Sequence, residues 1–237
     1  MPAPDEKLAE SLAALQALQK GGRRVIQSSE LSRVDRERLL ANGFLQEVMK
    51  GWLISSSPGA REGDSTPGYA SFWEFCARYC DQRFGDEWHL SPEQSLLLLA
   101  ESTVIPKQVV VSSPKGTNHK LDLLFGTSLY DLKTDMPDAA ALTERNGLRL
   151  LSPVAALVKM PESFFGRRPI ETQVVLAGLR DASDLLRLLL AGGNSVKAGV
   201  IAGAFRRIGR PELADEIVKT MSAAGYDVRE HDPFQAG

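Results

Sequence analysis

The order of helical and extended patterns in the first 57 residues constrains the fold more than any other feature of the chain. The patterns predict a leucine-striped helix, a short strand, two short helical segments and two strands around a tight turn. These segments cover, in order, residues 8–18, 24–27, 28–42, 44–48 and 52–55. This order predicts a winged helix-turn-helix over residues 1–57.

Local signals support the predicted helices. Leucines recur at spacings of three and four from Leu8 to Leu18, so they share one helix face. Ser28 or Ser29 can cap the second helix, and Ser32 can cap the third. The third helix would then begin immediately after Ser32, with its charged residues in the first turns.

A fold of this kind places a short helix in the major groove of DNA and a hairpin beside the phosphates. The candidate DNA-binding residues are Ser32, Arg33, Arg36, Lys50 and Arg24. The alternative is that these charges form an ordinary solvated helix face. The same fold also serves as a protein–protein module, so the fold alone does not establish DNA binding.

The charge balance argues against a strong non-specific DNA binder. Residues 1–60 contain eight Lys or Arg and seven Asp or Glu residues, and the whole chain has a formal net charge of −2. Because phosphate neutralisation supplies most non-specific affinity, we expect modest, salt-sensitive binding that paired sites or dimerisation would reinforce. No stretch is apolar enough for a membrane span, so we expect a cytoplasmic protein.

The rest of the chain predicts an α+β fold with further parts. A polar linker at 58–68 separates the first domain from an α/β domain at 69–136 and a mostly helical region at 137–237. The middle domain predicts helices at 72–83 and 91–101, with Ser91 as cap, and strands at 108–112, 121–125 and 128–133. The C-terminal region predicts helices at 152–160, 170–178, 182–191, 195–208 and 211–224. Cys76 and Cys80 are expected to be buried thiols and not metal ligands.

Several segments resemble a known family. Residues 42–53 resemble the wing of AbiEi-family antitoxins of type IV toxin–antitoxin systems, although Trp52 replaces the usual tyrosine. Residues 105–109 and 147–157 follow in the same order as the corresponding segments of the family. Residues 147–157 stand at the position where the family has a helix. Segments 205–210 and 224–229 resemble antitoxin-like regions associated with Fic toxins.

The resemblance implies an antitoxin that binds its own operator DNA and neutralises a cognate toxin. The toxin would be a nucleotidyltransferase or a Fic protein. Arg33, Arg36 and Lys50 match the family's basic helix and wing. The resemblance implies no catalytic residue, no metal and no cofactor.

A metal-dependent nuclease is an alternative function. Asp122 followed by Asp131 and Lys133 resembles the PD-(D/E)xK pattern, in which carboxylates hold Mg²⁺ and a lysine contacts the phosphate. Glu93 or Glu101 could add a third carboxylate. The simpler interpretation is a surface hairpin on which Asp131 and Lys133 form a solvated pair.

A non-DNA adaptor is the third possibility. Arg206, Arg207 and Arg210 crowd the end of one predicted helix, and Arg167 and Arg168 precede it in the chain. Such a cluster could bind an acidic protein surface or DNA. Cations at a helix end also complement the helix dipole without any partner.

Overall fold

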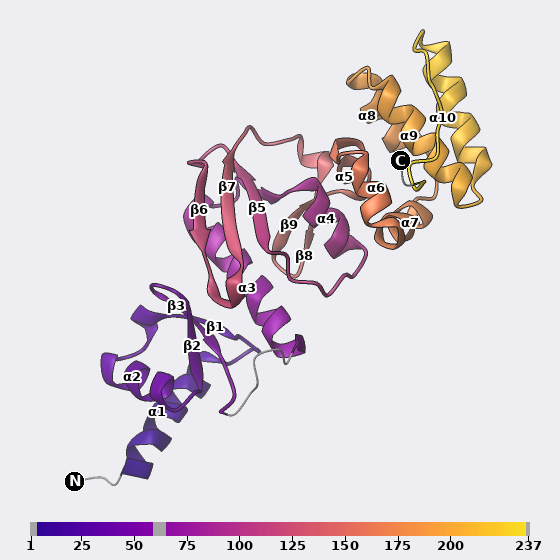
Figure 1. Cartoon of the computed structure of the whole chain (residues 1–237). Helices are drawn as coiled ribbons and strands as arrows, with labels where there is room; N and C mark the ends of the chain where they lie inside the picture. Colours follow the sequence, from indigo (N-terminus) through magenta and orange to yellow (C-terminus); the bar gives the residue numbers. More distant parts are fainter. Residues whose placement is uncertain (1–3, 59–64, 236–237) are drawn as a thin grey trace. The chain divides into compact units, whose positions relative to one another are not determined.

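The protein has a mixed α+β fold in the computed structural model, which describes residues 4–58 and 65–235 (Figure 1). Contacts between residues divide the chain into two units, each built from separate stretches of sequence. The first unit comprises Met1–Trp88, Val104–Thr134 and Asn146–Leu148, and the second comprises His89–Thr103, Asp135–Arg145 and Arg149–Gly237. Among the described residues, no helix combines the length and apolar character that crossing a membrane requires.

The first unit begins with a small helical and antiparallel β region. Its elements are α1 (Pro4–Leu18), β1 (Val25–Gln27), the 3-10 turn η1 (Ser28–Glu30), α2 (Arg33–Ala41), β2 (Leu45–Met49) and β3 (Trp52–Ser55). The three strands form an antiparallel sheet in the order β1-β3-β2. Gly51, with φ of 92°, allows the tight β2–β3 turn, because this backbone conformation is unfavourable for other residues.

One apolar core joins these elements. Leu15 of α1 and Leu39 of α2 are buried against Ile26, Leu45 and Leu53 of the three strands. The leucine stripe predicted for the first helix therefore supplies a core residue at Leu15, whereas the other leucines of the stripe are partly exposed. Burial of each such side chain contributes about 1.5–3 kcal/mol relative to solvent exposure.

A long helix and a second sheet complete the first unit. The elements are α3 (Ser65–Phe84), β5 (Gln108–Ser113), β6 (His119–Asp122), the 3-10 turn η2 (Leu124–Gly126) and β7 (Ser128–Lys133). β5 and β7 are parallel, and β6 pairs with the other edge of β7 in antiparallel orientation. Figure 1 shows α3 running alongside this sheet and reaching the N-terminal strands.

The second unit is mostly helical. Its elements are β4 (His89–Leu90), α4 (Pro92–Leu99), η3 (Ala139–Ala141), β8 (Leu142–Arg145), β9 (Leu148–Leu151), α5 (Pro153–Lys159), α6 (Ser163–Arg167), α7 (Pro169–Gly178), α8 (Ser183–Ala191), α9 (Ser195–Arg207) and α10 (Pro211–Ala223). Its large apolar core is centred on α5 and α9 and includes Leu157, Phe165 and Phe205.

Most predicted helices are confirmed within four residues at each end, but α3 begins seven residues before its predicted start, and the second predicted helix is only the 3-10 turn η1. The N-cap position of η1 is Gln27, so the cap predicted at Ser28 or Ser29 is wrong. Ser32, Ser91 and Ser152 cap α2, α4 and α5 through their hydroxyl groups. The strand predicted at 121–125 is β6, which ends at Asp122 before η2. The helix predicted at 152–160 is α5, whereas Leu148–Leu151, just before it, form strand β9, which was not predicted.

The predicted linker at 58–68 falls partly outside the described residues. Residues 59–64 of the predicted linker are outside the described residues. Because α3 begins at Ser65, the last four residues of the predicted linker are helical. α3 belongs to the same compact unit as the N-terminal sheet.

Candidate nucleic-acid interface

The hydroxyl group of Ser32 holds the start of α2. Its Oγ accepts a hydrogen bond from the backbone N–H of Asp35 at 3.1 Å and donates one to the Asp35 carboxylate at 2.6 Å. Hydrogen bonds from Ser32 and then Ser11 lower the pKa of Asp35. Ser32 therefore has a structural role, because its hydroxyl group already makes two hydrogen bonds with Asp35 of α2.

Two charged residues of α2 point towards α1. The Ser11 hydroxyl donates a hydrogen bond to Asp35 at 2.7 Å and accepts one from Arg38 Nη1, also at 2.7 Å. Arg38 Nη1 also lies 2.6 Å from the backbone oxygen of Lys7. Asp35 and Arg38 thus join the two helices, which leaves other residues of α2 to face solvent.

The outward face of α2 carries a basic, an apolar and an acidic residue. The side chain of Arg33 is 82% exposed, and its Nε lies 2.8 Å from Glu37 Oε1. This pairing raises the pKa of the Arg33 guanidinium and lowers the pKa of Glu37. Val34 is also exposed on this helix. The spacing of four residues between Arg33 and Glu37 is the sequence signal for this pair.

Ser28 connects α2 to the β2–β3 turn. Its backbone N–H donates a hydrogen bond to the Gly51 carbonyl at 2.9 Å, and its carbonyl accepts one from Arg36 Nη1 at 3.4 Å. Lys50 occupies the same turn, is exposed, and has no ion-pair partner within the described ranges 4–58 and 65–235. Ser28 therefore bonds both to Arg36 of α2 and to the turn that carries Lys50.

Arg24 lies away from the β2–β3 turn. It precedes β1, whose register with β3 pairs Val25 with Ile54 and Gln27 with Trp52. The β2–β3 turn is therefore at the Gln27 end of the ladder, and Arg24 is at the opposite end. Its side chain is exposed, while its backbone N–H donates to the Glu74 carboxylate at 3.1 Å.

α3 supports the N-terminal sheet from one side. The ring of Trp52 on β3 lies edge-on to Phe75 and Tyr79 of α3, at centroid distances of 5.6 and 6.2 Å. Arg78 donates a hydrogen bond to the carbonyl of Val25 at 2.9 Å. These contacts restrain β1 and β3, and through β3 they restrain the turn that carries Lys50.

Asp131 on β7 is a buried structural carboxylate. It accepts hydrogen bonds from Arg83 at 2.7 Å and from the backbone N–H of His119 at 2.6 Å. The backbone and hydroxyl of Thr117 add further bonds. Burial alone would raise the pKa of Asp131, but the bonds from His119, Arg83 and Thr117 outweigh it, so the pKa lies below its ordinary value.

The residues of the nuclease pattern do not converge. In the β6–β7 register Asp122 pairs with Ser128, whereas Asp131 pairs with His119 three residues further along. That separation is about 10 Å along the strands, too far for one Mg²⁺ to bridge both carboxylates. The expected surface pair of Asp131 with Lys133 is also wrong, because Asp131 is buried and bonded to Arg83. Across the described residues, no cluster of three His, Cys, Asp or Glu residues could hold a metal.

The basic cluster near the end of α9 is paired with acids. Arg206 contacts Glu230 and Asp215 at 2.5 and 2.8 Å, and Arg207 lies 3.6 Å from Asp232. Arg210 and Arg168 likewise pair with neighbouring glutamates. These arginines are therefore less available to bind an acidic partner than the sequence alone indicated.

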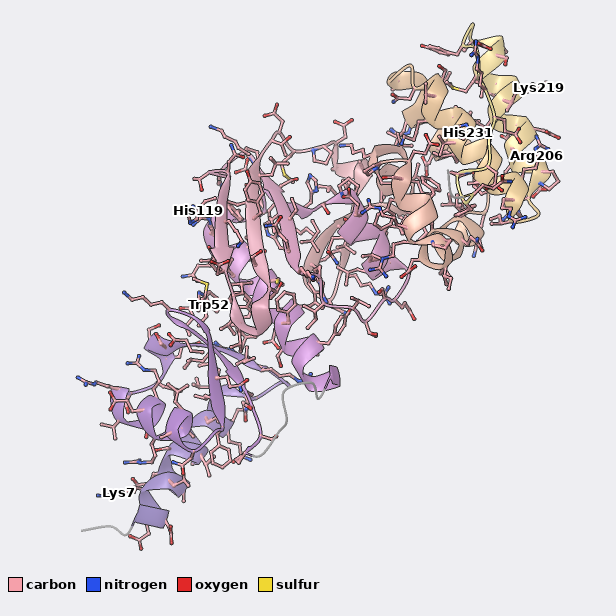
Figure 2. All side chains as sticks on the ribbon, in the orientation of Figure 1. Lys7, Trp52, His119, Arg206, Lys219 and His231 are labelled. Atoms are coloured by element: carbon pink, nitrogen blue, oxygen red, sulfur yellow. The ribbon has the colours of Figure 1, made fainter. Side chains whose placement is uncertain are left out.

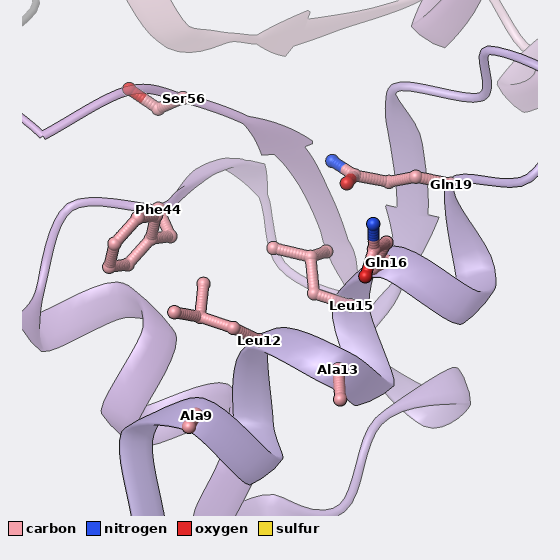
Figure 3. A pocket seen from close by; sticks show the side chains of 8 residues that line it. All are labelled: Ala9, Leu12, Ala13, Leu15, Gln16, Gln19, Phe44 and Ser56. Atoms are coloured by element: carbon pink, nitrogen blue, oxygen red, sulfur yellow. The ribbon is translucent and has the colours of Figure 1, made fainter. Parts of the chain in front are cut away.

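A hollow of about 490 Å³ beside α1 has no residues suited to catalysis (Figure 3). It is lined by Ala9, Leu12, Ala13, Leu15, Gln16, Gln19, Phe44 and Ser56. None of these lining residues is ionisable at neutral pH, so this hollow offers no general acid, base or metal ligand. The surface formed by α2, Ser28 and the β2–β3 turn is the better candidate site.

Comparison with known proteins shows the fold only. No family model matches the chain, and a search of curated proteins finds no match. The chain is similar to the crystal structure of the RV2827C protein from Mycobacterium tuberculosis, with a TM-score of 0.53 and 18% sequence identity. The alignment covers 90% of this chain and 81% of that chain. At this identity the similarity supports a shared α+β architecture and does not extend to function.

Proposed function

We propose that the N-terminal region of the first unit is a winged helix-turn-helix that binds duplex DNA. In this proposal α2 enters the major groove and the β2–β3 turn contacts the phosphate backbone. The observation that carries the proposal is the double hydrogen bonding of Ser28, which joins Arg36 of α2 to the turn bearing Lys50. A helix and a hairpin fixed to each other can contact neighbouring parts of one DNA site.

The distribution of acidic residues also supports DNA binding. Asp35 is turned towards α1, and Glu30 pairs with Arg23. Of the acids on α2, this leaves Glu37 facing outward beside Arg33. Glu37 and the exposed Glu47 of β2 still offset part of the positive charge, so we expect moderate affinity that depends strongly on salt.

Arg33→Ala should weaken binding to the promoter DNA upstream of the gene by about 1–3 kcal/mol if this side chain contacts a base. Lys50→Ala should weaken binding to all sequences alike and reduce the salt slope by about 1, because it removes a phosphate contact. Arg24→Ala should have a smaller effect, since Arg24 lies at the other end of the β1–β3 ladder. Gel-shift titrations at several salt concentrations measure all three effects. Unchanged affinity in both Arg33→Ala and Lys50→Ala would contradict the proposal.

A substitution that removes an acidic residue from α2 should have the opposite effect on DNA affinity. Glu37→Gln should tighten DNA binding by about 0.5–1 kcal/mol, because it removes a negative charge and releases Arg33 from its ion pair. Glu10→Gln makes the same charge change on the exposed surface of α1 and serves as the matched control. Equal effects of the two substitutions would show that net charge, and not the face of α2, controls binding.

We further propose that the protein is the antitoxin of a toxin–antitoxin system, acting as the repressor of its own operon. The support is the resemblance of residues 42–53 and later segments to AbiEi-family antitoxins, together with the DNA-binding surface described above. The second unit is a separate compact body with its own core, which is suited to an independent role in neutralising a toxin.

Neutralisation should survive loss of DNA binding. The full chain carrying Arg33→Ala and Lys50→Ala should rescue growth of cells that express the neighbouring open reading frame, while a promoter reporter is derepressed. Point variants are preferable to deletion of residues 1–68, because deletion would expose the aromatic face of α3 that packs on Trp52. Failure of even the wild-type chain to rescue growth would refute the antitoxin role without affecting the DNA-binding proposal.

A further inference from the structure

The C-terminal tail, residues 227–235, lies directly on the backbone of α9. After α10 the chain turns back at Gly225, and Figure 1 shows the tail running along the last two helices. A Cβ atom built at Gly199 would overlap the carbonyl of Arg229, and one built at Gly203 would overlap the carbonyl of His231. The two glycines, one helical turn apart, thus form a groove that the tail backbone fills.

Charge complementarity holds the middle of the tail. Arg206 Nε lies 2.5 Å from Glu230 Oε1, and a second bond from its Nη2 measures 2.9 Å. Arg207 lies 3.6 Å from Asp232. The tail therefore has acidic side chains at two alternate positions, Glu230 and Asp232. Helix α9 supplies Arg206 for the first and Arg207 for the second.

The tail makes one more polar contact, through His231, and one aromatic contact near its end. His231 Nε2 lies 2.6 Å from Glu162 Oε1, and Figure 2 shows His231 and Arg206 in this C-terminal part of the unit. The ring of Phe234 lies edge-on to Phe165, with centroids 5.9 Å apart. Pro233 beside it is buried.

The tail is bound as a ligand would be, not as a structural element. Within the described residues, none of the backbone-to-backbone hydrogen bonds outside helices and strands involves residues 227–235. Most of its side chains are exposed or half-buried, and a hollow of about 300 Å³ lined by Gly203, Arg206, Arg207, Glu230 and Asp232 remains beside it. Exposed ion pairs contribute little stability each, so the tail is held mainly by contacts that another peptide could reproduce.

We propose that the tail is an exchangeable ligand of the α9 groove, and that an extended segment of a partner protein takes its place. The chemistry of that segment follows from the tail: acidic residues at two alternate positions, followed two residues later by an aromatic ring. Backbone contact with Gly199 and Gly203 requires it to be extended. This inference does not depend on the proposed DNA binding.

Exchange can be tested in the full chain with a fluorescent peptide that has the sequence of residues 226–235. Glu230→Ala with Phe234→Ala weakens the attached tail and leaves the groove intact, so this variant should bind the peptide at least about tenfold more tightly than the wild type. The expected factor is large because an attached tail competes at millimolar effective concentration. Adding Gly203→Ala should abolish binding, whereas adding Gly178→Ala, a helical glycine with open space around it, should not change it.

A second measurement reports on the attached tail itself. Cys76 and Cys80 are buried and burial raises the pKa of both thiols, so Gln235→Cys provides the one reactive thiol for a fluorophore. Gly203→Ala should lower the anisotropy of this probe, and Gly178→Ala should leave it unchanged. Equal peptide binding by wild type and the tail-weakened variant, or by the two glycine variants, would overturn the proposal. Concentration-dependent dimers abolished by Gly203→Ala would instead assign the groove to the tail of a second copy.

Discussion

Asp131→Asn should lower the free energy of unfolding by about 1–3 kcal/mol, one of the two largest stability effects expected in this protein. The substitution removes the charge that Arg83 faces at 2.7 Å and replaces an acceptor of the His119 and Thr117 hydrogen bonds with an amide. Urea unfolding followed by circular dichroism measures the change.

Asp122→Asn is the matched control for this substitution. The Asp122 side chain is 81% exposed and pairs with Lys120 on the same strand, so the loss should be no more than about 0.5 kcal/mol. The pH dependence gives a second check. Because the folded state lowers the pKa of Asp131, its contribution is present at neutral pH and is lost as pH falls below the ordinary carboxyl range. Equal stability of the two variants would contradict the buried position of Asp131.

Trp52→Ala should destabilise the protein by about 3–5 kcal/mol, because it removes a buried indole ring and leaves a cavity against α3. Both edge-on contacts, with Phe75 and Tyr79, would be lost. Trp52→Tyr introduces the residue usual in the resembling family and should cost no more than about 2 kcal/mol, since an aromatic ring remains. Denaturant titration with circular dichroism detection measures both.

Val34→Ala tests whether the Trp52 effect is specific to packing on α3. Val34 is 59% exposed on α2, so its loss should change stability by no more than about 0.5 kcal/mol. A cost for Trp52→Ala as small as that for Val34→Ala would show that α3 does not support β3 in solution.

The predictions that succeeded rest on local chemistry. Ser32 and Ser91 could be identified as helix caps because a cap needs only the residues next to it. The order of helices and strands through residue 55 could also be predicted, because helix and strand periodicities are local signals.

Two errors in the fold have different causes. Asn146–Gly147 is a strong hairpin signal and joins β8 to β9, with positive φ at both residues, but neither of these two strands was predicted. The parallel pairing of β5 with β7 had no local signal, because β6 lies between them in sequence and pairs with β7 from the other side.

The candidate site was predicted in part. The Arg33–Glu37 pair follows from a spacing of four residues and could have been anticipated. The involvement of Arg38 with Lys7 depends on α1 packing against α2, and the burial of Asp131 depends on Arg83, which is 48 residues away. Neither contact has a signature in the sequence near the residue concerned.

The discontinuity of the first unit has a consequence for the timing of synthesis. Its N-terminal sheet and α3 are complete by residue 88, but β5, β6 and β7 come from 104–134 and the unit closes with 146–148. At about 5–20 residues per second, the ribosome needs roughly 3–12 seconds to add that part of the chain. During this interval the end of α3 lacks the contacts that Arg83 makes with Asp131 and that the Phe84 carbonyl makes with Lys115, so a nascent chain is open to chaperones and proteases. The helix that packs on Trp52 therefore gains the last part of its compact unit only after residue 148 has been made.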